Sequence, residues 1–163
     1  MEPKTMRLMR KTNSQAGFTL IEVMLVVMII GVLAAIVLPS FRLDAARAKV
    51  SEAVLAFGPC KDAVSEGYIT GGPLPTVWGC ESSGRVSQYV GSVTVDPNGV
   101  ITVGLQGFND LRLDTFDITM VPEDNTGRAL TQDDSGNGVT RWRCGSPPGT
   151  TLDPKYLPAS CRG

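Results

Sequence analysis

Residues 17–38 read GFTLIEVMLVVMIIGVLAAIVL, and this apolar stretch determines how the rest of the chain is interpreted. About 20 predominantly apolar residues are enough for a helix to cross the hydrocarbon core of a bilayer. One carboxylate, Glu22, interrupts the stretch. A charge at mid-helix costs about 2.5–3.5 kcal/mol on insertion scales, and somewhat less near an end. No basic residue lies within the stretch, so Glu22 requires a partner from outside it.

The preceding segment, residues 1–16, is polar and basic. Its charged residues are Glu2, Lys4, Arg7, Arg10 and Lys11. This excess of positive charge predicts that the N-terminal end stays in the cytoplasm. No A-x-A cleavage site follows the apolar stretch, so we do not expect the cut behind it that is typical of a secretory signal.

A cut between Gly17 and Phe18 would remove the basic segment and keep the apolar helix. It would also create a new α-amino group on Phe18. That ammonium group would lie at i,i+4 spacing from Glu22 of the same chain, or could reach Glu22 of a neighbouring subunit. Cleavage at this bond would therefore supply the missing partner.

Apolar residues continue beyond the apolar stretch at steps of three or four, which predicts one long helix from Phe18 to about Gly67. These positions are Leu43, Ala46, Val50, Val54, Phe57, Cys60, Val64 and Tyr68. The first half of this helix is apolar all round, and the second half, residues 39–68, has one stripe that a sheet could cover. Pro39 and Pro59 lack the N–H that helical bonding requires, so we expect a bend at each.

After the helix, a Gly- and Pro-rich loop opens at residue 71 and the apolar period changes to two. The expected strands are 85–95, 100–105, 115–121 and 139–144. Asp96-Pro97-Asn98-Gly99 forms a tight turn between the first two, and the other connections are too short or too polar for crossover helices. The predicted fold class is α+β, a long N-terminal helix packed on a four-stranded antiparallel β-sheet.

Four cysteines lie in the part of the chain that is predicted to be exported, where thiols are oxidised. They are Cys60, Cys80, Cys144 and Cys161. Three pairings are possible, and proximity in the sequence favours Cys60–Cys80 and Cys144–Cys161. A zinc site with four cysteine ligands is the alternative, but no C-x₂₋₄-C pair is present.

The charge and composition exclude several classes of function. The chain has no histidine, which excludes His-dependent triads, HExxH zinc sites, and haem or copper ligation by imidazole. The net charge is −1, and removal of a leader with four basic and one acidic residue leaves about −4. We therefore expect no general affinity for nucleic acid, and no catalytic residue or cofactor is predicted.

Three polar clusters have alternative interpretations. Residues 133–138 (DDSGNG) have a composition that suggests calcium but lack the spacing and distal Glu of an EF-hand, so a solvated turn is expected. A wet acidic face is expected at Asp110, Asp114 and Asp117. A basic patch that could contact DNA or another anionic surface is formed by Arg141, Arg143, Lys155 and Arg162. Solvation, or contact with a neighbouring subunit, is the alternative for this patch.

A basic leader that ends in glycine, then Phe-Thr-Leu-Ile-Glu and an apolar helix with Gly31 and Pro39, closely resembles a type IV prepilin. In that family, prepilin peptidase cleaves after the glycine, the new N-terminal Phe is methylated, and the carboxylate five residues into the mature chain helps to dock each subunit. The resemblance thus implies cleavage between Gly17 and Phe18, N-methylation of Phe18, and a role of Glu22 in assembly. It also implies that the segment from Gly31 to Pro39 can lose helicity in the filament.

A second part of the chain supports this resemblance. Residues 142–144 (WRC) and 155–161 (KYLPASC) resemble the C-terminal disulfide loop of major type IVa pilins, and residues 46–52 (ARAKVSE) resemble the continuation of the pilin helix. The resemblance therefore spans nearly the whole chain. It implies a leader at residues 1–17, an apolar helix at 18–38 and an amphipathic helix half at 39–68. The head would comprise residues 69–163 and contain a disulfide loop at 144–161.

The function that this resemblance implies is that of a structural subunit, not an enzyme. The precursor would lie in the inner membrane and, with prepilin peptidase and an inner-membrane assembly platform as partners, would form a homo-oligomeric helical filament outside the cell. Such pili serve adhesion, twitching motility or DNA uptake. A minor pilin and a type II secretion pseudopilin are close alternatives, and the disulfide loop favours a true pilin. A membrane-anchored periplasmic binding protein or enzyme is the alternative of another class.

Overall fold

The structure is a computed structural model that describes residues 17–109 and 113–163. The predictions for the basic leader and for Asp110 fall on residues outside these ranges. The chain divides into two compact units, of which the first ends at Pro39 and the second comprises Ser40–Gly163.

Helix α1 comprises Leu20–Leu55 and continues through both Gly31 and Pro39. It begins after Thr19, whose hydroxyl and carbonyl oxygens accept from the backbone N–H of Glu22 at 3.4 and 3.1 Å. This satisfies one of the orphan donors of the first turn. From Leu20 to Leu38 the helix is long and apolar enough to cross a membrane, and none of this stretch is buried in the structure. Its large apolar side chains therefore have no cover within the described residues.

The prediction of one long helix to about Gly67, with only a bend at Pro59, is wrong there, because the helix is interrupted. Helix α1 ends at Leu55, and a second helix, α2, comprises Gly58–Thr70. Pro59 has no N–H to donate to the carbonyl of Leu55. Just before it, the hydrogen-bond pattern changes from the α-helical spacing of four residues to the 3₁₀ spacing of three. The N–H groups of Ala56 and Phe57 donate to carbonyls three residues back, at 3.2 and 3.4 Å. The buried stripe nevertheless stays in phase across the break.

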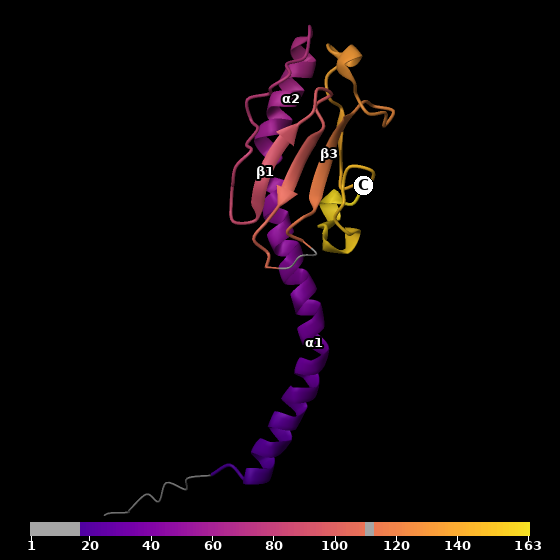
Figure 1. Ribbon diagram of the computed structural model, residues 1–163. Helices are drawn as coiled ribbons and strands as arrows, with labels where there is room; N and C mark the ends of the chain where they lie inside the picture. The colour runs from indigo at the N-terminus through magenta and orange to yellow at the C-terminus, as the bar shows by residue number, and fades with distance from the viewer. Residues whose placement is uncertain (1–16, 110–112) are drawn as a thin grey trace, which may run out of the picture. The chain divides into compact units, whose positions relative to one another are not determined.

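Four antiparallel strands form one sheet in the order β1-β2-β3-β4, as the sequence predicts. Their bounds are Val90–Val95 for β1, Ile101–Leu105 for β2, Asp117–Glu123 for β3 and Arg141–Cys144 for β4. The strands predicted at 85–95 and 139–144 begin later than expected, and the strand predicted at 115–121 is displaced towards its C-terminal side. Figure 1 shows α2 behind the sheet, with β1 and β3 in front of it.

The core of the second unit lies between the helical stripe and one face of this sheet. The helical contribution is Val50, Ala53, Phe57, Cys60, Val64 and Tyr68, all of which are fully buried. The sheet contributes alternate residues of its strands, among them Val93, Val103, Ile118 and Met120. This alternation is what a sheet with one covered face requires, and the expected fold class is confirmed.

Both disulfides that proximity favours are present, Cys60–Cys80 and Cys144–Cys161, with Cα–Cα distances of 5.2 and 4.6 Å. The first joins α2 to the loop that follows it. The second joins the end of β4 to the short 3₁₀ helix η3 (Ala159–Cys161), so the C-terminal segment folds back on the sheet.

Candidate functional site

Glu22 and Phe18 border the same hollow of the first unit. It has a volume of about 270 Å³, and the apolar residues that complete its lining are Val23, Val26 and Val27. Phe18 is 83% exposed. None of the ion pairs among the described residues involves Glu22. A single carboxylic residue thus borders the same hollow as Phe18, on an otherwise apolar helix surface.

Gly31 and Pro39 both lie inside α1, on the turns that follow this hollow. A Cβ added at Gly31 would meet nothing within 4 Å, so no packing constraint in the described residues requires glycine there. The sequence-based idea that the segment between them loses helicity concerns the filament, and it stays a prediction.

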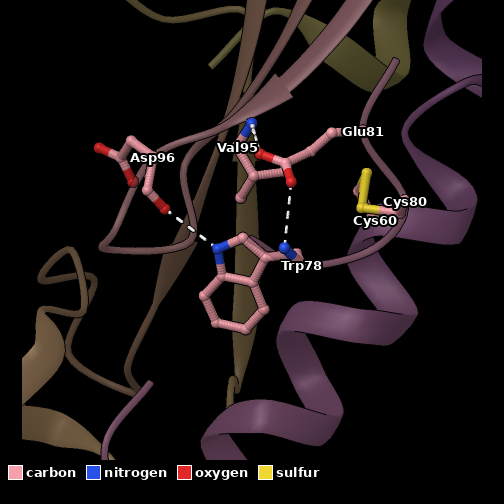
Figure 2. Close-up of a disulfide and its surroundings, with 6 residues drawn as sticks. All are labelled: Cys60, Trp78, Cys80, Glu81, Val95 and Asp96. Atoms are coloured by element: carbon pink, nitrogen blue, oxygen red, sulfur yellow. Dashed lines mark hydrogen bonds between the residues drawn. A yellow bond between two sulfur atoms is a disulfide. The ribbon is translucent and has the colours of Figure 1, made fainter. Parts of the chain in front are cut away.

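The Cys60–Cys80 disulfide is part of a larger attachment of the loop that follows α2. Figure 2 shows Glu81 turned towards the backbone N–H groups of Trp78 and Val95, which donate to its two carboxylate oxygens at 3.0 and 3.3 Å. One carboxylate therefore links the loop to the end of β1. The sequence analysis missed Glu81, and its only signal in the sequence was its place next to Cys80.

The indole ring of Trp78 completes this attachment. Its Nε1–H donates to the carbonyl of Asp96 at 3.2 Å, as Figure 2 shows. A Cβ at Gly67 would lie 2.6 Å from the ring, so the ring packs directly on the backbone of α2. The loop is thus fixed to α2 by a disulfide and by an aromatic contact, and to the first hairpin by hydrogen bonds.

The C-terminal segment is attached to β3 by a pair of buried threonines. Thr119 and Thr150 share a hydroxyl–hydroxyl bond of 2.9 Å, and the N–H of Thr119 donates to the hydroxyl of Thr150 at 3.0 Å. A Cβ at Gly149 would lie 2.7 Å from Thr119, so only glycine allows this close approach. Together with Cys144–Cys161, these contacts hold the segment on the outer face of the sheet.

The basic residues that the sequence singled out are only partly brought together. Arg141, Arg143 and Arg162 line one cleft of the second unit. Lys155 is absent from this cleft; its ammonium group lies 2.7 Å from the carboxylate of Asp153, and this pairing lowers the pKa of Asp153.

Glu123 is the residue of this region that sequence reasoning missed. It is 2% exposed, and its carboxylate accepts from the Nε–H groups of Arg141, at 3.1 Å, and of Arg143. The register of β3 and β4 places Glu123 opposite Arg141 and Val121 opposite Arg143. A carboxylate at the end of one strand carries no signal of this pairing, because the register is not written in either strand alone.

The acidic turn is more ordered than the sequence predicts. A surface turn is present at residues 133–138, as expected, and within it the carboxylate of Asp134 accepts from the guanidinium of Arg128 at 2.7 and 3.1 Å and from Thr131. Hydrogen bonds from Arg128 and Thr131 hold the pKa of Asp134 well below its usual range. Asp134 is thus a capping residue that fixes this turn.

A second carboxylate and a buried phenol complete the electrostatics of this end of the second unit. The hydroxyl of Thr126 donates to Asp124 at 2.6 Å and is the main cause of a pKa of about 2 there. Burial, followed by the negative charges of Asp134 and Asp96, raises the pKa of Tyr68 to about 12. Among residues 17–109 and 113–163, no group of three or more acidic or cysteine side chains could hold a metal ion.

Two family models match the chain. The model of the pilin of bacterial filaments matches residues 46–162, and the model of the prokaryotic N-terminal methylation motif matches residues 12–38. The second match contains Gly17, Phe18 and Glu22.

Curated relatives match over nearly the whole length. The fimbrial protein EcpC of Eikenella corrodens is 39% identical, over 91% of this chain and 91% of its own. The type IV major pilin protein PilE of Neisseria gonorrhoeae and a fimbrial protein of Neisseria meningitidis serogroup B are each 35% identical, over 91% of this chain and 94% of theirs. With its N-terminal methylation motif, its long helix on a four-stranded sheet and its C-terminal disulfide, this chain belongs to the type IV pilin family, whose members are structural proteins and not enzymes.

Proposed function

We propose that this chain is the major subunit of a type IV pilus, cut between Gly17 and Phe18 and then polymerised. The observation that carries the proposal is the single carboxylate of Glu22, which borders the same hollow as Phe18 on an exposed apolar helix surface. An apolar surface of this kind is stable only when a bilayer or other helices cover it. The family match and the major pilins among the relatives support the same reading.

Prepilin peptidase is the partner that this chemistry requires first. Before cleavage the nitrogen of Phe18 belongs to a neutral amide, which cannot balance the charge of Glu22. Hydrolysis of the Gly17–Phe18 bond yields an ammonium group there, and N-methylation keeps its positive charge. The ammonium can then pair with Glu22, within one chain or between adjacent subunits.

When the apolar half of α1 leaves the membrane, its surface must be buried against other subunits. An inner-membrane assembly platform would move the apolar half of α1 from lipid into the core of a homo-oligomeric helical filament outside the cell. In this dry core the ion pair of Glu22 specifies the position of each subunit, because a register that leaves the carboxylate without a partner carries a large desolvation cost. Adhesion, twitching motility or DNA uptake would be functions of the complete filament.

The test compares Glu22→Gln and Glu22→Asp with the wild type in a piliated host. Mass spectrometry of the chain reports cleavage and methylation, and sheared surface material reports assembly. We expect the Gln variant to be cleaved but absent from sheared filaments, and the Asp variant to retain part of its assembly because it keeps the charge. Normal filaments from the Gln variant would refute the role of the ion pair.

The same measurements separate the alternatives. A membrane-anchored binding protein would keep residues 1–17 and would form no filaments. A minor pilin or a pseudopilin would be processed, but it would be scarce in sheared material. A major pilin dominates that material.

A further inference from the structure

The cleft between β4 and the C-terminal segment collects positive charge. It has a volume of about 360 Å³, and its charged side chains are three guanidinium groups, of Arg141, Arg143 and Arg162, and one carboxylate, of Glu123. The side chains thus sum to a charge of about +2, or +1 in total where Gly163 carries a terminal carboxylate. This excess contrasts with the net charge of −1 of the whole chain.

The arginines of the cleft are held in place before any ligand arrives. Glu123 accepts from Arg141 and Arg143, and the carbonyl of Leu157 accepts from the Nε–H of Arg162 at 3.0 Å. Arg143 precedes Cys144, and Arg162 follows Cys161, so the disulfide Cys144–Cys161 fixes the backbone on both sides of the cleft. A ligand would therefore lose little affinity to the ordering of side chains.

Donors remain for a ligand. A guanidinium has five N–H groups. Among the hydrogen bonds of the described residues, Arg143 and Arg162 each donate through Nε–H alone. Their terminal NH₂ groups thus remain for an acceptor. Planar NH₂ pairs that carry positive charge match the oxygens of a carboxylate, sulfate or phosphate group.

The size and charge of the cleft favour a small ligand over DNA. A duplex is held by many phosphate contacts along its backbone, whereas three arginines with a buried carboxylate among them offer few. Trp142 also lines the cleft, but its indole is partly buried against the core, with the ring centroid 5.8 Å from the ammonium nitrogen of Lys61 of α2.

We propose that this cleft is a binding site for one oxyanion group, a carboxylate, sulfate or phosphate, carried by a small ligand. The guanidinium groups of Arg143 and Arg162 bind its oxygens, and Glu123 positions Arg143. All residues of this site belong to the second unit.

The test titrates the detergent-solubilised full chain with glucuronate, glucose 6-sulfate and, as the neutral control, glucose, and follows backbone amide chemical shifts by NMR. We expect shifts at β4 and η3 with both acidic sugars and none with glucose. The stronger of the two acidic sugars identifies the preferred oxyanion. Equal shifts with glucose would overturn the proposal.

Two variants of the cleft and one matched control make the test specific. Arg162→Gln and Arg141→Gln each remove one positive charge, and Arg85→Gln removes the same charge from the loop before β1. Arg85 is a close match for Arg162, because its Nε–H also donates to a backbone carbonyl, that of Ser87 at 3.2 Å. Loss of a charge-assisted hydrogen bond predicts roughly tenfold weaker binding for Arg162→Gln, a smaller loss for Arg141→Gln, and no change for Arg85→Gln.

Tryptophan fluorescence checks that each variant is folded, and Arg162→Lys is measured in place of Arg162→Gln if the latter is not. Retention of the charge in the Lys variant, with loss of the planar fork, predicts an intermediate affinity. Equal weakening by all three Gln variants would reduce the effect to net charge and overturn the proposal. The proposal would also be overturned if a 12-base-pair DNA duplex bound more tightly than the small anions and if Arg85→Gln weakened DNA binding as much as Arg162→Gln does.

Discussion

The two compact units of this chain differ in how far their apolar side chains are buried within the chain itself. The large apolar residues from Leu20 to Leu38 are 49–78% exposed, and no part of this stretch is buried in the structure. The second unit encloses Phe57, Tyr68 and Ile118 completely and carries two disulfides. The first unit thus depends on a cover supplied from outside, whereas the second contains its own core.

Because of this difference, substitutions in the first unit should affect assembly, and substitutions in the second unit should affect the stability of the folded chain. Side chains in the apolar half of α1 make their contacts with lipid or with other subunits. A truncation there should therefore weaken membrane insertion or filament assembly, and not the stability of the isolated chain. A truncation in the core of the second unit, Ser40–Gly163, which is called the head from here on, removes contacts that the isolated chain does make. Both tryptophans, Trp78 and Trp142, lie in the second unit, so their fluorescence reports the folding of the head alone.

The largest effect is expected from Phe57→Ala. This side chain is fully buried, and its removal should lower the free energy of unfolding by about 3–5 kcal/mol, through lost burial and the cavity that remains. The matched variant is Leu33→Ala, at a position that is 58% exposed, and it should change that free energy by less than about 0.5 kcal/mol. Urea unfolding of the full chain in detergent measures both. Equal losses in the two variants would contradict the division into two regions.

Removal of either disulfide should have the next largest effect. The bonds join residues 20 and 17 positions apart, and such loop lengths predict a loss of about 3 kcal/mol for each pair of Cys→Ala substitutions. Because the loops are similar in length, Cys60/Cys80 and Cys144/Cys161 should lose similar amounts, measured by the same urea unfolding. A negligible loss for one pair would show that noncovalent contacts alone hold that loop.

A pair of glycine substitutions sharpens the comparison further. Gly67→Ala would place a Cβ 2.6 Å from the ring of Trp78, which cannot retreat freely because its indole N–H is bonded to Asp96. The overlap costs about 1–3 kcal/mol and exceeds the gain in helix propensity of up to about 1 kcal/mol, so the head should lose about 1 kcal/mol.

Gly31→Ala is the control for that substitution. Nothing lies within 4 Å of its added Cβ, so the urea unfolding of the head should not change. Stabilisation of the head by Gly67→Ala would show that Trp78 moves aside readily, against the attachment that Figure 2 shows.

The smallest effect concerns the response of the head to acid. The lowered pKa of Asp134 means that its contribution to stability is complete above the ordinary aspartate value of 3.8. That contribution is lost as the pH falls below this value towards the lowered pKa. Asp134→Asn should therefore weaken the head at neutral pH and flatten the fall in stability between about pH 5 and pH 2.

Urea unfolding over this pH range measures that response, with Arg128→Gln as the companion variant. Arg128 is the main cause of the lowered pKa, so its removal should flatten the same part of the curve. An unchanged slope in both variants would assign the acid response to other carboxylates.

Much of the fold could be predicted from the sequence, because periodicity survives local detail. The stripe through Val50, Phe57, Val64 and Tyr68 is buried throughout, even though the helix breaks between Leu55 and Gly58. Both disulfides also follow the simplest rule of proximity. The break itself was underestimated, because a proline in the sequence indicates a lost hydrogen bond but not whether the helix bends or ends.

The polar site could be predicted only in part. Arg141 and Arg143 were identified as members of a basic patch, but their partner Glu123 was missed, although only 18 and 20 positions separate it from them. Likewise, Asp134 appeared to be a residue of a solvated turn, because its sequence neighbours are small and polar. The partners of Glu123 come from another strand, whereas Asp134 is bonded by Arg128, six residues earlier, and by Thr131, three residues earlier.

By itself the sequence determined that this protein has an apolar N-terminal helix with one carboxylate, a helical stripe and alternating strands, because composition and period act residue by residue along the chain. Only the tertiary structure decided the polar contacts of the head. The register of β3 and β4 places Glu123 between two arginines, and the disulfide Cys144–Cys161 brings Arg162 to the same cleft. The physical reason is that a hydrogen bond depends on the relative positions of two segments, which neither segment encodes alone.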